Sequence, residues 1–95
     1  MVEKSQNQYD SSKAKYAIAQ TKFYLGFYDE AIIIFNELEA FFIEENDRAY
    51  LNTIHALGLC NMKISNFNKV TYYNSLGIKL CHDWEIPEMI KYFEH

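Results

Sequence analysis

The sequence contains little of what an all-β protein needs, because only one proline and three glycines occur among its 95 residues. Strands joined by tight turns rely on these residues to reverse the chain, so their scarcity argues against a sandwich or a barrel. Hydrophobic residues make up 49% of the chain and aromatic residues 17%, which is enough for one small core. We therefore expect a single all-α domain.

Metal-site and membrane patterns are also missing. The two cysteines, Cys60 and Cys81, have no CxxC or Cys/His spacing around them, and helical periodicity places both at buried positions. No apolar stretch is long enough to cross a membrane, and the first eleven residues are polar. These observations predict no metal, no cofactor, no membrane contact and a cytoplasmic location.

Charge is separated along the chain, although the net value is only −4. Residues 23–47 carry seven acidic residues and no basic one, whereas residues 48–82 carry four basic residues and no acidic one. Four dispersed bases without an arginine cluster form a poor surface for phosphates, so a direct nucleic-acid partner is not expected. The simpler interpretation is attraction between adjacent helices of opposite charge.

Two segments that start 39 residues apart, Leu25–Ala31 and Ile64–Val70, share one pattern. In each, an apolar residue closes a helix, a small residue permits a turn, an aromatic fills the corner, and an Asp or Asn is followed by a small or branched apolar residue. This order is typical of a tight helix-turn-helix corner. The sequence therefore predicts two helical hairpins of similar build.

Hydrophobic spacing and capping residues set the expected boundaries. They predict a flexible segment 1–11 and one domain 12–94, made of hairpin 12–44, hairpin 47–82 and closing helix 87–94. Pro87 fits the first turn of that closing helix. The expected helix caps are Asp10, Ser11 or Ser12 for the first helix, Asp29 for the second, and Asn46 or Asp47 for the third.

The first hairpin resembles the tetratricopeptide repeat (TPR) at a small residue in its first helix, an aromatic at the corner, and an alanine and an aromatic in its second helix: Ala19, Tyr28, Ala31 and Phe35, with Gly26 at the turn. The second hairpin matches less well, since its equivalents are Gly58, Phe67, Val70 and Asn74. The resemblance implies two hairpins stacked in a right-handed superhelix. Such stacks leave a concave groove, lined by the first helices, that binds peptides or partner helices.

The 39-residue spacing is longer than that of the simple repeat. Longer hairpins of this kind, together with the segments Tyr50-Leu51-Asn52, Leu57-Gly58-Leu59-Cys60 and Tyr72-Tyr73-Asn74, resemble the TPR-type domains of the peptide-pheromone regulators of Gram-positive bacteria, the Rap, NprR and PlcR group. This resemblance implies a sensor of a short signalling peptide, or a protein that regulates a transcription or sporulation regulator. Those regulators also carry an output domain, for which this sequence has no room. We therefore expect a fragment, a stand-alone sensor or antagonist, or an unrelated small adaptor.

Helical spacing predicts which side chains face the groove: Lys13, Tyr16, Gln20, Phe23, Tyr24, Asn52, His55, Leu59 and Lys63. Gln20 and Asn52 are the strongest candidates, because a side-chain amide both donates to and accepts from an extended backbone. Their alternative role is ordinary surface polarity. His55 has no Cys, Ser or carboxylate one turn away in sequence, so no catalytic pair forms around it and no enzyme is expected.

The second helix has more apolar surface than two neighbours cover, at Ile33, Ile34, Phe41 and Phe42. One interpretation is that Trp84 and the last helix fold back over part of it. The other is an exposed interface, used by a homodimer or by a folded partner docked on a small assembly adaptor.

Overall fold

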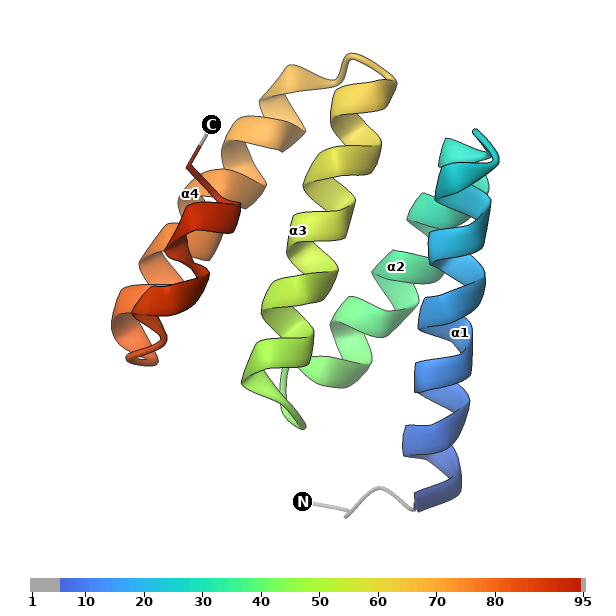
Figure 1. Ribbon diagram of the computed structural model, residues 1–95, viewed down its shortest axis with the longest axis horizontal. Helices are drawn as coiled ribbons and strands as arrows, with labels where there is room; N and C mark the ends of the chain where they lie inside the picture. The colour runs from blue at the N-terminus through green and yellow to red at the C-terminus, as the bar shows by residue number, and fades with distance from the viewer. Residues whose placement is uncertain (1–5, 95) are drawn as a thin grey trace.

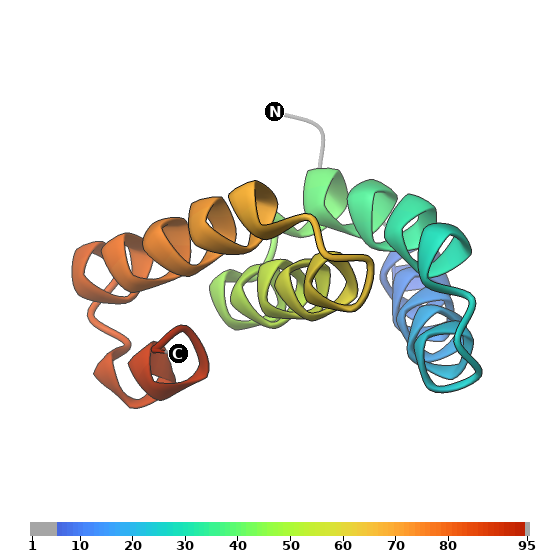
Figure 2. The ribbon, with the colours of Figure 1, turned by 90° about the horizontal axis from the view of Figure 1, so that it is seen from above.

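The structure is a computed structural model that describes residues 6–94. Their elements are α1 (Gln6–Tyr24), α2 (Tyr28–Phe42), α3 (Asp47–Lys63), α4 (Phe67–Asp83) and the 3-10 helix η1 (Pro87–Tyr92) (Figure 1). Each consecutive pair of helices packs together, and viewed from above α2 and α4 lie in one layer while α1, α3 and η1 lie on its other side (Figure 2). The expected all-α hairpin fold is confirmed, whereas the right-handed superhelix stays a prediction.

The two hairpin corners have the same backbone. Gly26 and Ser65 adopt left-handed φ angles of 89° and 63°, and each follows a helix that ended two residues earlier. Around each corner the chain forms the same pair of hydrogen bonds, in which the amides of Phe27 and Asn66 reach back to Lys22 and Asn61. This is the Schellman arrangement, which satisfies the last carbonyls of a helix.

The corner aromatics are less alike than their backbones. Tyr28 is half-buried and packs edge-on against Phe23, with 5.5 Å between ring centroids. Phe67, at the equivalent position, is 61% exposed, and Met62 stands where the first hairpin has Phe23. The repeated sequence pattern therefore specifies the backbone of the turn, but it does not specify how the aromatic side chain at the corner packs.

The first helix begins at Gln6 and not near Ser12, so the predicted flexible segment is too long; residues 1–5 lie outside the described part. Tyr9 explains the difference, because its ring packs edge-on against Phe41 and Phe42, at centroid distances of 6.1 and 6.2 Å. Its hydroxyl also accepts a hydrogen bond from Nδ2 of Asn46 at 2.6 Å. Long-range contacts thus extend a helix that its local sequence does not demand.

The predicted caps are mostly wrong. Asp10, Ser11 and Ser12 lie inside α1, and Asp29 lies in the first turn of α2, where its charge favours the positive end of the helix dipole. Asn46 is confirmed as the cap of α3, since its side chain accepts from the Ala49 amide at 2.9 Å.

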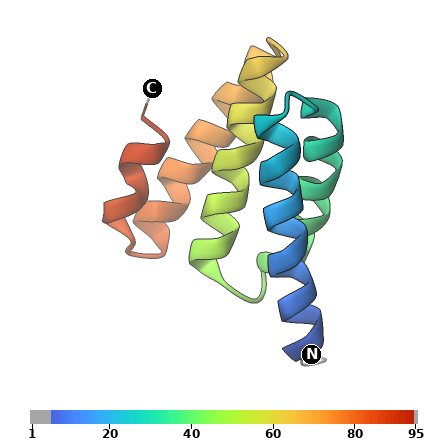
Figure 3. The same ribbon diagram turned by 45° about the vertical axis from the view of Figure 1, so that its right-hand side comes forward.

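The closing helix is found where expected, in 3-10 form. Phe93 is fully buried against Gly77 of α4, and Figure 3 shows η1 lying alongside that helix. An ion pair between Arg48 and Glu88 ties η1 to the start of α3. Trp84 packs on Tyr50 of α3 at 5.9 Å between ring centroids, so the expectation that it covers α2 is wrong.

The cysteines behave as predicted. Cys60 and Cys81 are fully buried free thiols, and burial raises the pKa of Cys60 to about 11. Both act as small apolar side chains in the core.

Candidate functional site

A partly enclosed space lies between α1 and α3. These helices are the two walls, and α2, which packs against both, supplies the floor. Tyr16 crosses the space from α1, and its hydroxyl donates to the backbone carbonyl of Asn52 on α3 at 3.4 Å. We call the space the α1–α3 groove; Tyr16 divides it into two hollows.

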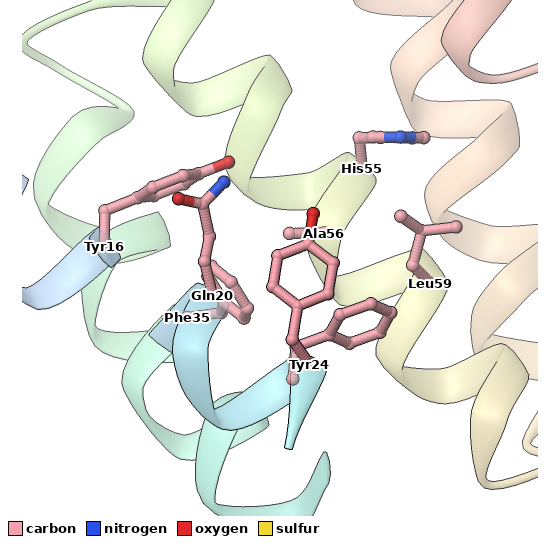
Figure 4. Close-up of a pocket in the computed structure, with 8 residues that line it drawn as sticks. Tyr16, Gln20, Tyr24, Phe35, His55, Ala56 and Leu59 are labelled. Carbon is pink, nitrogen blue, oxygen red and sulfur yellow. The ribbon is translucent and has the colours of Figure 1, made fainter. Parts of the chain in front are cut away.

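The first hollow has a volume of about 190 Å³ and Phe35 of α2 at its floor. Figure 4 shows Tyr16 and Gln20 side by side on α1, facing α3. The residues that line it are Tyr16, Gln20, Phe23, Tyr24, Phe35, His55, Ala56 and Leu59. The hollow is therefore aromatic, with one amide at its wall.

The second hollow has a volume of about 240 Å³ and Phe42 of α2 at its floor. Its lining residues are Tyr9, Lys13, Tyr16, Phe42, Ala49 and Asn52. The Lys13 ammonium lies over the Tyr9 ring, 5.0 Å from its centroid, which is a cation–π contact. This hollow therefore combines an apolar base with one positive charge and one amide.

Eight of the nine residues predicted for the groove line one hollow or the other: Lys13, Tyr16, Gln20, Phe23, Tyr24, Asn52, His55 and Leu59. Lys63 does not, because it lies exposed in the last turn of α3, beyond the first hollow. Tyr9 lines the second hollow but was not predicted as a groove residue, because it falls in the segment that was expected to be flexible. Phe35 and Phe42 were not predicted as the floor, because helical spacing does not show that α1 and α3 leave a gap through which α2 is exposed.

The groove is lined by neutral polar and aromatic groups and one ammonium, that of Lys13. Burial, with a smaller contribution from Tyr24, raises the pKa of the Tyr16 phenol, so it remains a neutral hydrogen-bond donor. The His55 ring packs against Tyr92 of η1 and against Phe93, which directly follows η1, at centroid distances of 5.4 and 5.8 Å. None of the residues that line the two hollows is a carboxylate. Within residues 6–94, no group of three His, Cys, Asp or Glu side chains is placed to hold a metal ion.

The predicted apolar patch on α2 is largely covered. Phe42 is only 3% exposed, and Ile34 and Phe41 are half-buried against the core. Ile33 alone projects outward, with 61% of its surface exposed. The expectation of a contiguous interface at these four residues is wrong, because Tyr9 of the early-starting α1 covers Phe41 and Phe42.

Comparison of the chain with known protein families, with curated proteins and with solved structures finds no match. Among the helices of residues 6–94, none has the length and apolar character needed to cross a membrane.

Proposed function

We propose that the α1–α3 groove binds a short peptide or an extended segment of a protein partner, without catalysis. The observation that carries the proposal is the pair of apolar hollows, each floored by a phenylalanine and each bordered by one side-chain amide, Gln20 or Asn52. Small apolar pockets that hold alternate side chains, beside amides that pair with the backbone, suit an extended chain.

The dimensions of the groove set the length of the peptide. Gln20 and Lys13 mark the two hollows on α1 and stand seven residues apart, which is about 10 Å along a helix. An extended peptide advances about 3.3 Å per residue. Side chains two or four residues apart lie on the same face of an extended peptide, so a pair with that spacing would enter the two hollows, and a heptapeptide covers both.

The resemblance to TPR domains of peptide-pheromone regulators supports a signalling peptide as the ligand, and a regulatory role in the cytoplasm follows from the same resemblance. The single ammonium at the second hollow, from Lys13, favours a peptide whose carboxylate lies at that end.

Selection of random heptapeptides from a phage-displayed library, followed by fluorescence anisotropy on the enriched peptides, tests the proposal. Ala56→Phe fills the first hollow and should weaken binding at least about tenfold, a difference of about 1.4 kcal/mol. Ala40→Phe is the matched control, since Ala40 is exposed on α2 outside both hollows. Peptides that bind the Ala56→Phe variant as tightly as the native chain would disprove the groove as their site.

Asn52→Ala tests the amide. The Tyr16 hydrogen bond uses the Asn52 backbone carbonyl, so the substitution leaves it in place and the melting temperature should not change. Peptide affinity should fall several-fold, since a hydrogen bond is worth about 1 kcal/mol. Asn68→Ala, on the other layer of the molecule, should leave affinity unaltered; equal effects of the two substitutions would remove Asn52 from the role.

A further inference from the structure

A separate, polar hollow, which we call the Glu39 hollow, lies on the other layer of the molecule, between α2 and α4. It has a volume of about 670 Å³ and is open to solvent. In Figure 2 these two helices form the layer opposite α1 and α3, so this hollow is separate from the α1–α3 groove. Three amides border it, from Asn36, Asn66 and Asn68, together with Glu39, Lys69, Tyr72 and Tyr73.

Glu39 is the unusual member of this set. Its carboxylate is half-buried and forms no hydrogen bond and no ion pair within residues 6–94. Burial raises its pKa, and the Lys69 ammonium is near enough to lower it in part, yet the two groups form no ion pair. A carboxylate that is partly removed from water and has no bonded cation is a site where a cation is favoured.

Aromatic side chains surround this carboxylate. Tyr50 and Tyr73 are buried beside it, and burial followed by the charge of Glu39 raises the pKa of each phenol to about 12. Tyr72 is 57% exposed, and its ring meets that of Tyr73 edge-to-face at 5.1 Å. Tyr72 and Glu39 line the same hollow, so the exposed ring of Tyr72 is a surface of that hollow on which a flat cation can stack.

We propose that this hollow binds a guanidinium group, presented by an arginine side chain of a partner polypeptide. Glu39 accepts two of its N–H groups, Tyr72 stacks on its plane, and the carbonyl oxygens of the neighbouring Asn side chains accept the others. Guanidinium fits better than ammonium, because it is planar, less strongly hydrated, and carries five donors for several acceptors. The acidic composition of residues 23–47 adds a longer-range attraction for a basic segment.

Other ligand classes fit the hollow less well. An anion would meet the charge of Glu39, and a neutral sugar would leave that charge uncompensated. Lys69 competes with the incoming cation, so the proposal has a distinctive consequence: removing the charge of Lys69 strengthens binding, whereas removing the charge of Glu39 weakens it.

The test is an NMR titration of the full chain at neutral pH with Nα-acetyl-arginine methylamide. Its citrulline counterpart, which has nearly the same shape without the charge, and its lysine counterpart serve as comparison probes. The arginine probe should produce saturable shifts in the amides of residue 39 and residues 66–73. Equal shifts from the citrulline probe would overturn the proposal, and equal affinity for the lysine probe would overturn its preference for guanidinium.

Three variants separate the contributions. Glu39→Gln should weaken binding at least about tenfold, as expected for loss of a charge-assisted pair, and Lys69→Gln should strengthen it several-fold. Glu37→Gln should change nothing, because Glu37 is exposed and points to Lys15 of α1 at 3.9 Å. Circular dichroism melting curves confirm that each variant folds. Unchanged affinity of Glu39→Gln in a folded variant would refute the site.

Acidification supplies an independent readout. Protonation of Glu39 removes the acceptor charge, so binding should be lost as pH falls through the raised pKa of that carboxyl, at a higher pH than for an ordinary glutamate. Lys69 and the Tyr72 phenol also face the site, as do the phenols of Tyr50 and Tyr73, whose pKa values are raised to about 12. Ala56→Phe in the α1–α3 groove should not alter this titration. The proposals for the groove and for the Glu39 hollow are therefore tested independently. A binding curve that is flat down to pH 4 would contradict the role of Glu39.

Discussion

In the first hairpin α2 lies against α1 and α3, whereas in the second hairpin α4 lies against α3 and the short helix η1. Equivalent positions therefore have different neighbours. Leu38 of α2 is a full core residue, and 39 positions later Gly77 of α4 leaves the space that the ring of Phe93 fills. Equivalent positions of the two hairpins can therefore hold a large side chain or none, depending on how much space the neighbouring element leaves.

The same comparison extends to the closing helix. Met89 of η1 follows Tyr50 of α3 by 39 residues, and Phe93, just after η1, follows Ile54 of α3 by the same number. All four residues are buried. By this spacing, η1 corresponds to α1 and α3, the first helices of the two hairpins. It therefore gives α4 a partner on the side that α3 does not reach.

The largest expected effect comes from removing that partner. Phe93→Ala should destabilise the fold by about 3 kcal/mol or more, as for other buried Phe-to-Ala changes. Urea denaturation measures the loss, and hydrogen exchange in residues 86–94 should increase most. Phe67→Ala is the control, since that ring is exposed and should cost less than about 0.5 kcal/mol. Equal losses from the two variants would contradict the buried role of η1.

Next in size is Gly77→Ala. A Cβ at this position would overlap the ring of Phe93, so we expect a loss of about 1–3 kcal/mol from overpacking. Gly58→Ala in α3 is the matched comparison, because its Cβ would meet that of Tyr73 at an ordinary 3.7 Å. It should be neutral or stabilising by up to about 1 kcal/mol. In the background of Phe93→Ala, Gly77→Ala should lose most of its cost.

The two corners provide a smaller and reciprocal test. Ser65 holds a left-handed backbone that disfavours any residue with a Cβ, so Ser65→Gly should raise stability by up to about 1 kcal/mol. Gly26→Ser should lower it by about 1–2 kcal/mol for the same reason. Thermal denaturation of both variants checks the pair, and shifts of the same sign would show that the corners are not equivalent.

The smallest effect concerns Glu39, whose counterpart in the second hairpin is the half-buried Ile78. The folded chain raises the pKa of Glu39 above its ordinary 4.5, so folding favours the protonated form. This contribution is fully present below the unfolded pKa and is lost as pH rises through the folded one. Glu39→Gln should therefore be slightly more stable than the native chain at pH 7, and the difference should vanish near pH 4. A difference that grows on acidification would reverse this assignment.

Much of the candidate groove could be predicted, because its residues recur at helical spacing on two helices whose limits are marked by local signals. The exceptions have long-range causes. Tyr9 belongs to the groove because Phe41, Phe42 and Asn46 hold it there, and those partners are more than thirty residues away. No local pattern around Tyr9 distinguishes such a residue from one in a flexible end.

The apolar patch on α2 failed as a prediction for the same reason. Ile33, Ile34, Phe41 and Phe42 show that the helix is apolar on several sides, but their spacing does not show which neighbour covers which side. The Glu39 hollow was likewise beyond the sequence, since it needs α2, α3 and α4 to converge on one carboxylate.

Four α-helices, the 39-residue register, the position of each hairpin corner and a cap for α3 at Asn46 or Asp47 could all be predicted from the sequence. These depend on backbone preferences and hydrogen bonds within a few residues, which the local sequence specifies. How early α1 begins, which phenylalanines form the floor of the groove, and the packing of Phe93 over Gly77 emerge only in the folded chain. Those outcomes depend on which surfaces exclude water together, and that is a property of side chains far apart along the chain.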